Sequence, residues 1–312
     1  MKFGVYLYPP AGGGDPREIV QLALEAERLQ FDSAWLGDHI AWPAHFEPGT
    51  HDRNVGGVAP PAAVVDLPVI EPLTMLSYVA ATVHRIKLGL GVLVAPYRNP
   101  VLAAKMLSML DLLSEGRLIV GVGSGWLEEE FPMLGAPAFS ERGRVTDEYL
   151  RVFIELWTSP EPQFDGDYAT VINIRFNPKP VQQPHPPLWI GGNGIPAIKR
   201  AVAYGQGWMP LHQTPLEMKA KVQRLREIAH QEGRDPGEVG VAVGCGLHFS
   251  EATGARPERD TLTGTAADIV EQLRRYQDAG VDEVRLLNHG YVTVPDLVGS
   301  WDRFLTEVTP HF

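Results

Sequence analysis

The chain has 312 residues, of which 44% are hydrophobic and 21% charged, with 32 glycines and 27 prolines. These fractions exclude an intrinsically disordered chain, and glycine without a three-residue period excludes a collagen-like one. The 38 acidic residues outnumber the 27 lysines and arginines, so the formal net charge is −11. This balance argues against sequence-independent nucleic-acid binding and against docking on anionic membranes, because both need a basic surface.

Cysteine content and the N-terminus indicate the compartment. The single cysteine, Cys245, cannot form an internal disulfide. The first ten residues lack the apolar core and the small-residue cleavage site of a signal peptide. No apolar stretch approaches the ~20 residues that a membrane helix needs. We therefore expect a soluble, cytoplasmic protein.

Strand and helix signals alternate along the chain. Apolar, strand-like runs begin near residues 2, 33, 86, 117, 187, 207, 238 and 282. Helical spacing follows each of them, over 15–29, 72–83, 100–113, 141–157, 196–204, 215–231, 265–279 and 295–307. Buried-type strands that alternate with helices predict an α/β fold with a parallel sheet. Because the units show no break in composition, we expect one domain over 1–312, a closed (β/α)₈ TIM barrel, with a doubly wound sheet as the alternative.

Two segments depart from this regular alternation. Residues 40–71, after the second strand, are rich in proline and glycine and poor in periodicity. Loops of this length inside a domain are usually lids or binding loops, so we expect a lid there. Residues 164–181, before the fifth strand, carry a β-like pattern that predicts a β excursion from the barrel.

Barrel enzymes carry their active sites at the C-terminal ends of the strands. Asp38 and His39 directly follow the second strand and precede the long loop. Histidine can act as an acid or a base near neutral pH, and a carboxylate can accept a hydrogen bond. The alternative is that Asp38 caps the loop and His39 is an ordinary polar residue of the rim.

A glycine-rich segment, Gly191-Gly192-Asn193-Gly194, lies between the fifth strand and the helix that begins near Pro196. Small residues let backbone N–H groups approach a phosphate, and the helix N-terminus adds partial positive charge. We therefore favour a phosphate site over a plain strand-to-helix turn that uses glycine for its positive φ.

Other motifs are absent or fail. The run Gly121–Gly125 does not complete a dinucleotide fingerprint, since position 126 is tryptophan. His45, His51 and Asp52 in the lid match no metal-ligand spacing, so we expect no metal. The chain has no G-x-S-x-G elbow and no phosphate-binding P-loop, which leaves hydrolase and kinase functions little support.

Several blocks in fixed order resemble the luciferase-like monooxygenase superfamily. They are Trp35–His39, Gly91–Leu93 with Pro96–Pro100, Gly121–Phe131, Glu141–Glu148, Lys179–Gln182 with Pro186–Gly192, and Tyr204–Trp208. The resemblance extends to about Pro210 and implies a barrel that holds a flavin or deazaflavin. The Trp-Leu-Glu-Glu-Glu and Glu-Arg-Gly-Arg blocks look most like the branch that uses the deazaflavin coenzyme F420.

The resemblance also implies roles for individual residues. The position of Asp38 contacts the cofactor in that family, and the position of His39 lies near the reacting ring. A non-proline cis peptide in the third strand, here Gly91–Val92, supports the back of the ring. The cofactor-binding set that it implies, phosphate contacts included, is Asp38, Gly91, Val92, Ser124, Gly125, Trp126, Glu129, Gly192, Asn193, Gly194, Pro196 and Ala197.

The sequence departs from the family pattern at two positions, and the first of them limits the substrate. The sugar-phosphate dehydrogenases of the family carry a glutamate, their proton acceptor, where this chain has Trp126. We therefore expect an apolar or aromatic substrate rather than a sugar phosphate. Gln206 also replaces the usual aspartate of a Gly-Asp-Gly turn.

The expected function is F420-dependent hydride transfer to or from a small organic molecule, with His39 as the catalytic proton donor. One alternative is an FMN-dependent monooxygenase that takes reduced flavin from a partner reductase and uses oxygen. The other is a non-catalytic protein that stores or carries the cofactor. The resemblance further implies a homodimer and a separate cofactor-reducing enzyme as the electron source.

Overall fold

Parallel strands form the centre of the fold in the computed structural model, which describes residues 1–10, 14–44, 68–251, 260–288 and 290–312. Within these residues eight strands close into a barrel, since β12 pairs with β1 and β10 pairs with β9. In barrel order they are β1 (Lys2–Tyr6), β2 (Ser33–Leu36), β3 (Lys87–Leu90), β5 (Leu118–Gly123), β8 (Leu188–Gly191), β9 (Gly207–Met209), β10 (Gly240–Phe249) and β12 (Glu283–Leu287). The predicted (β/α)₈ TIM barrel is confirmed.

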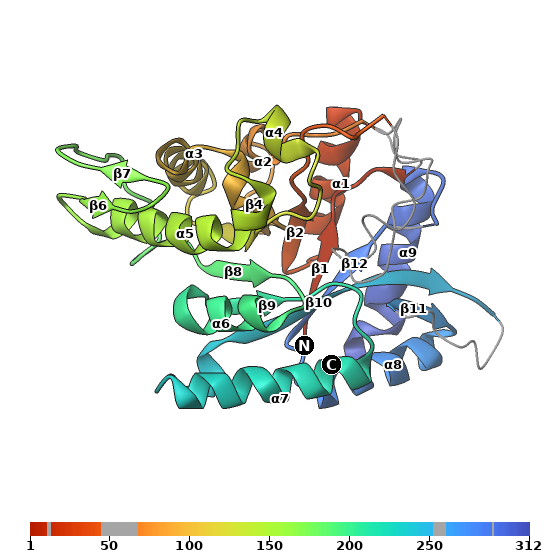
Figure 1. The fold of residues 1–312 in the computed structure, drawn as a ribbon. Helices are drawn as coiled ribbons and strands as arrows, with labels where there is room; N and C mark the ends of the chain where they lie inside the picture. The colour runs from red at the N-terminus through yellow and green to blue at the C-terminus, as the bar shows by residue number, and fades with distance from the viewer. Residues whose placement is uncertain (11–13, 45–67, 252–259, 289) are drawn as a thin grey trace.

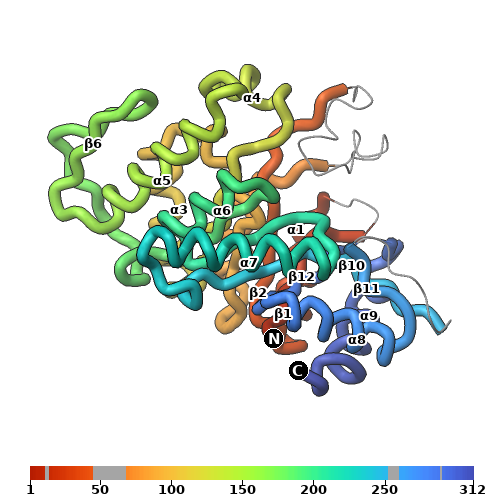
Figure 2. Tube along the Cα trace, turned by 60° about the horizontal axis from the view of Figure 1, so that its bottom comes forward, coloured from red at the N-terminus to blue at the C-terminus, as the bar shows by residue number. Residues whose placement is uncertain are grey.

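Helices surround the barrel (Figure 1). They are α1 (Pro16–Arg28), α2 (Pro72–Ala80), α3 (Pro100–Leu113), α4 (Glu130–Met133), α5 (Arg142–Thr158), α6 (Ile195–Tyr204), α7 (Pro215–Gln231), α8 (Ala266–Asp278) and α9 (Val294–Glu307). In the described part of the chain, no helix is both long and apolar enough to cross a membrane. The two ends of the chain lie close together (Figure 2), and the rings of Phe3 and Phe312 are 6.0 Å apart.

Helix starts are set by short polar side chains followed by proline or an acidic residue. The Asn99 side chain accepts hydrogen bonds from the first backbone N–H groups of α3. Thr214 and Thr265 form capping boxes with Glu217 and Asp268 at the starts of α7 and α8. Because these caps satisfy N–H groups that have no partner within the helix, the expected starts agree with the observed ones to within one residue.

The core has two layers, one between the barrel and its helices and one inside the barrel. The interior cluster contains Tyr6, Trp35 and Met209. Trp35 lies where a Cβ on Gly89 would come within 2.2 Å of its ring, and Trp189 has the same relation to Gly207. Large side chains on one strand thus fill the space left by glycines on the next, so the barrel is a packed core rather than a pore.

The third barrel strand is interrupted at Gly91–Val92, where the peptide bond is cis as expected. Beyond it the chain continues as β4 (Leu93–Val94). Gly89 pairs with Ile119 and Leu93 with Val122, so four steps along one strand match three along β5. The chain therefore bulges at this point, which turns the Val92 side chain toward the mouth of the barrel.

The β excursion expected over 164–181 is an antiparallel hairpin, β6 (Phe164–Asp165) and β7 (Thr170–Val171), which projects beside α5 (Figure 1). Glu148 of α5 holds its turn by accepting hydrogen bonds from the backbone N–H groups of residues 167, 168 and 169 at 2.7–2.9 Å. This anchor connects the hairpin to the helical layer. Most of the expected lid, 45–67 with His45, His51 and Asp52, lies outside the described residues.

One strand differs from the prediction. The seventh barrel strand was expected over 238–244, but β10 runs over Gly240–Phe249, and Glu238 belongs to a short 3₁₀ helix, Pro236–Glu238. An unpredicted strand, β11 (Thr261–Gly264), pairs in parallel with the far end of β10, from Gly246 to Phe249. β10 thus extends beyond the barrel wall, because β11 pairs with the part that the barrel strands leave free.

Candidate active site

A cavity of about 380 Å³ opens at the C-terminal ends of the barrel strands. Strands β1, β2, β5, β8 and β9 and the β3–β4 bulge all contribute to its wall. The lining residues are Tyr8, Gly37, Asp38, His39, Gly91, Val92, Val94, Gly123, Ser124, Gly125, Trp126, Gly191, Gly192, Asn193, Gly194, Met209 and Leu211. The volume lies within the range of pockets that bind small organic molecules and cofactors.

Most of the predicted site residues come together in this cavity. The cavity is lined by His39 together with Asp38, Gly91, Val92, Ser124, Gly125, Trp126, Gly192, Asn193 and Gly194. Glu129, Pro196 and Ala197 are not among the lining residues: Glu129 is exposed just before α4, and Ala197 is buried in the first turn of α6.

The back wall is built around Val92. A Cβ on Gly123 would lie 2.4 Å from Val92 Cγ2, and one on Gly191 would lie 2.6 Å from Val92 Cγ1. The Val92 side chain therefore occupies the space that side chains of β5 and β8 would otherwise need. With Met209 it gives the cavity an apolar face, which suits the flat ring of a flavin or deazaflavin.

The glycine-rich turn before α6 forms another side of the cavity. Gly192 has φ +124°, a backbone conformation that favours glycine. The side-chain oxygen of Asn193 accepts a hydrogen bond from the backbone N–H of Leu211 at 2.8 Å, so this residue fixes the turn to the loop after β9. Gly194 is the N-cap of α6 and supplies no capping side chain. Backbone and helix N-terminus are thus the polar features of this side, as a phosphate site requires.

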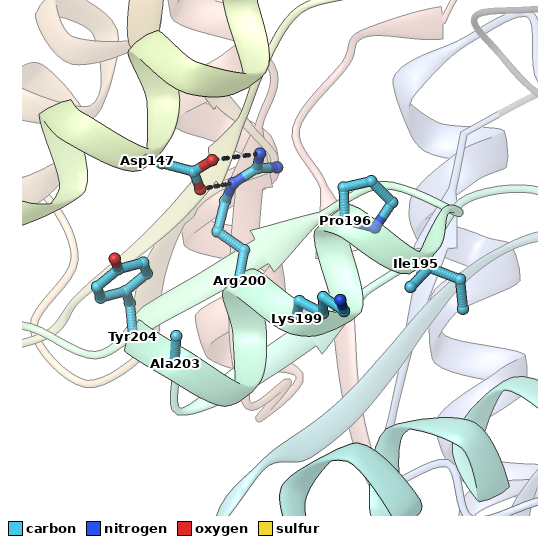
Figure 3. Close-up of a pocket in the computed structure, with 7 residues that line it drawn as sticks. All are labelled: Asp147, Ile195, Pro196, Lys199, Arg200, Ala203 and Tyr204. Atoms are coloured by element: carbon cyan, nitrogen blue, oxygen red, sulfur yellow. Dashed lines mark hydrogen bonds and ion pairs between the residues drawn. The ribbon is translucent and has the colours of Figure 1, made fainter. Parts of the chain in front are cut away.

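A second hollow of about 490 Å³ lies on the outer side of α6, toward α5 (Figure 3). Pro196 and Lys199 line it, and an ion pair between Arg200 and Asp147, with Nε–Oδ1 at 2.5 Å, crosses it (Figure 3). It shares no lining residue with the cavity at the barrel mouth and receives no strand end. We therefore assign the chemistry to the mouth.

Asp38 is paired within the protein. Its buried carboxylate forms a bidentate ion pair with Arg98 at 2.6 and 2.9 Å and accepts the Val94 backbone N–H at 2.9 Å. Arg98 also contacts Glu71 at 2.6 Å. Burial alone would lower the pKa of Arg98, but the hydrogen bonds and charges of Asp38 and Glu71 outweigh it and raise the pKa. In this structure Asp38 thus holds the β2 end against the segment after β4.

His39 lies among aromatic rings and one carboxylate. Its ring centroid is 4.5 Å from that of Trp42 and 5.3 Å from that of Trp126. Its Nδ1 is 2.9 Å from Oε2 of Glu130, which also accepts a hydrogen bond from the Tyr97 hydroxyl at 2.6 Å. Burial alone would raise the pKa of Glu130, but the hydrogen bonds from His39, Ile40 and Tyr97 outweigh it and lower the pKa.

The prediction from sequence missed Glu130, Tyr97 and Arg98. A signal for Glu130 was present, since Leu127, Glu130, Phe131 and Leu134 follow helical spacing and share the inward side, whereas Glu128 and Glu129 are exposed. Nothing local marks Arg98 or Tyr97, because their partners Asp38, Glu71 and Glu130 lie in distant parts of the sequence.

The model of the luciferase-like monooxygenase family matches residues 1–253. An F420-dependent glucose-6-phosphate dehydrogenase of Amycolatopsis mediterranei is 34% identical over 198 residues, 62% of this chain and 53% of that protein. An FMNH(2)-dependent dimethylsulfone monooxygenase of Pseudomonas putida is 31% identical over 165 residues, 52% of this chain and 45% of that protein. The chain thus spans about half the length of these curated relatives.

Among solved structures, an F420-dependent secondary alcohol dehydrogenase in complex with an F420-acetone adduct superposes with a TM-score of 0.78. The identity is 21%, over 99% of this chain and 98% of that one. At this identity the likeness shows a shared fold.

Proposed function

The chain belongs to the luciferase-like monooxygenase family, and from this premise we propose that it is an F420-dependent oxidoreductase. In this proposal it transfers a hydride between the deazaflavin and an apolar or aromatic organic substrate. The observation that carries the proposal is the cavity at the barrel mouth, which combines the Val92 wall, the glycine-rich turn before α6 and the ring of His39.

The residues present fit such a cofactor. The apolar wall of Val92 and Met209 would lie behind the tricyclic ring, and the turn Gly192–Gly194 with the start of α6 would hold a phosphate. The bound deazaflavin would supply or accept the hydride. The relative from Amycolatopsis mediterranei, named as F420-dependent, supports this cofactor over FMN.

The other residues of the mouth have separate tasks. His39 would exchange the proton that accompanies the hydride, because its imidazole lines the cavity and lies beside the buried carboxylate of Glu130. Trp126, in edge contact with His39, would give the substrate an apolar surface and exclude water. No carboxylate stands at position 126, so the proposal does not extend to oxidation of a sugar hydroxyl.

A second candidate is an FMN-dependent monooxygenase, which the relative from Pseudomonas putida favours. The same cavity would accept either ring, so the two functions differ in their use of oxygen. For the F420-dependent reaction we also propose a separate enzyme that reduces the cofactor, and a homodimer in solution.

The test is a titration of the purified protein with F420 and with FMN, followed by quenching of cofactor fluorescence. We expect saturable binding of F420 and weaker binding of FMN. The Ser124→Leu variant fills the mouth and is expected to lose binding, whereas Ser140→Leu, which changes an exposed serine, keeps it. Preferential binding of FMN, with oxygen consumption, would replace the proposal by the monooxygenase.

A further inference from the structure

Glu130 is a buried carboxylate that has three donors and one histidine nitrogen around it. Its side chain is 0% exposed, and each oxygen has two hydrogen-bonding neighbours. Oε1 accepts the backbone N–H groups of Ile40 at 2.5 Å and Ala41 at 3.2 Å. Oε2 accepts the Tyr97 hydroxyl at 2.6 Å and faces Nδ1 of His39 at 2.9 Å.

This arrangement decides where His39 carries its proton. The pKa of Glu130 is lowered, so the carboxylate stays ionised and only accepts hydrogen bonds. Burial and the hydrogen bond to Glu130 raise the pKa of Tyr97, so its hydroxyl stays protonated and acts as a donor. Nδ1 of His39 must then carry a hydrogen, because two acceptors 2.9 Å apart without one would repel each other.

We propose that Glu130 is a positioning residue that fixes His39 in the Nδ1–H tautomer and leaves Nε2 as the atom that exchanges a proton with the substrate. This inference rests on the proposed function for the identity of the reaction, but not for the state of the ring. In the reducing direction, His39 protonated on both nitrogens would donate the Nε2 proton to the substrate, which leaves the ring in the neutral Nδ1–H form. Uptake of a proton from solvent at Nε2 then restores the donor.

The substitution Glu130→Gln tests this proposal, because it replaces one of the two carboxylate oxygens by an amide group. In Glu130→Gln a single oxygen remains, and the backbone N–H groups of Ile40 and Ala41 both require an acceptor. The amide NH₂ of the glutamine would then face His39, and its N–H would donate to Nδ1. We therefore expect the proton of the neutral His39 ring to move from Nδ1 to Nε2, which gives the Nε2–H tautomer. Glu128→Gln is the matched control, since it changes a carboxylate two residues away that is exposed.

The experiment determines the tautomer of His39 directly, in the cofactor-free protein. Histidine labelled with ¹⁵N gives two nitrogen shifts that distinguish the tautomers, and the signals of His39 are assigned by their loss in His39→Gln. At alkaline pH, where the ring is neutral, we expect Nδ1–H in the wild type and in Glu128→Gln. We expect Nε2–H in Glu130→Gln.

An Nε2–H tautomer in the wild type would overturn the inference, and this measurement needs no variant to fold. An Nδ1–H tautomer that persists in folded Glu130→Gln would overturn it as well. Tyr97→Phe removes one donor to Glu130 but keeps the carboxylate, so it is expected to retain the wild-type tautomer.

Turnover separates this inference from the proposed function. If the enzyme turns over, Glu130→Gln should lower kcat by roughly 10²–10⁴-fold, the usual contribution of general acid–base catalysis, while Glu128→Gln leaves it unchanged. A protein that binds no F420 would refute the proposed function, and the nitrogen shifts would still decide the role of Glu130.

Discussion

His39 is the residue on which the proposed chemistry depends most directly. Its ring borders the cavity, lies between two tryptophans and contacts a buried carboxylate. None of these neighbours belongs to the glycine-rich turn or to the Val92 wall that would hold the cofactor. Binding and proton transfer are therefore assigned to different residues of the same cavity, and the two tasks can be separated by mutation.

We expect His39→Ala to lower turnover by roughly 10²–10⁴-fold, the range for loss of a general acid, with little change in the Kd for F420. The physical reason is that the substitution removes the proton donor and leaves the cofactor wall intact. Steady-state kinetics measures the turnover, and fluorescence titration of the same preparation measures the Kd for F420. His84→Ala, an exposed histidine before β3, is the control and should change neither value. An equal loss of turnover and affinity would contradict this assignment.

The sequence predicted which strand ends form the mouth of the barrel, but it did not predict the hydrogen-bond partner of His39. His39 was predicted because it follows a strand directly, and strand ends are readable from apolar runs. Glu130 was missed in favour of Glu129, one residue away, because the short helix α4 turns Glu130 inward. A one-residue difference in direction is set by packing of Leu127 and Phe131, which a strand-end rule does not consider.

At the scale of elements, the pair of Asp38 and Arg98 connects the end of β2 to the segment that leads into α3. Both side chains are nearly buried, at 0% and 10% exposed, and Glu71 adds a contact from the start of α2. Two successive βα units of the barrel, β2–α2 and β3–α3, are thus joined at one guanidinium. This geometry gives Asp38 a structural role in addition to the cofactor contact that the family resemblance implies.

Removing Asp38 should therefore destabilise the protein. Asp38→Ala leaves the Arg98 guanidinium buried with Glu71 alone, and breaking a buried pair typically costs about 3–5 kcal/mol. Denaturant unfolding of the cofactor-free protein measures this change in free energy. Glu271→Ala, which breaks an exposed pair with Arg275 on α8, should have a much smaller effect. If both variants lose the same free energy of unfolding, the pair of Asp38 and Arg98 does not stabilise the contact between these elements.

The elements themselves were largely predictable, because a parallel barrel repeats one local signal. Each strand is an apolar run, and several helices begin at a side-chain cap such as that of Asn99 or Thr214. Strand β11 was not, since Thr261–Gly264 alternates partly buried and buried residues over four positions only. Its partner is the extension of β10 outside the barrel, and a pairing of this kind has no counterpart in the regular unit.

At the scale of the whole molecule, buried or partly buried carboxylates connect segments that are distant in sequence. Glu27 at the end of α1 accepts the backbone N–H groups of His84, Arg85 and Ile86. Burial alone would raise the pKa of Glu27, but these hydrogen bonds outweigh it and lower the pKa. The pKa values of Glu71 and Glu130 are lowered in the same way, by hydrogen bonds that outweigh burial.

A pKa that is lower in the folded protein means stability that is present above the unfolded pKa and lost as the pH falls through the folded one. The ordinary glutamate value is about 4.3, so the free energy of unfolding should fall as the pH is lowered from about 5 to about 3. Denaturant unfolding at a series of pH values measures the slope. Glu27→Gln should show a shallower slope than the wild type, and a wild-type profile that is flat over this interval would refute the linkage.

The bulge at Gly91–Val92 has a consequence for changing the protein's specificity. Since Val92 fills the positions of two absent side chains, no substitution at Gly123 or Gly191 fits without displacing it. Trp126 and Leu211, at the rim of the same cavity, are not among the residues that a side chain at either glycine would meet. A library that randomises the rim while leaving the two glycines fixed would explore new substrates on an unaltered cofactor wall.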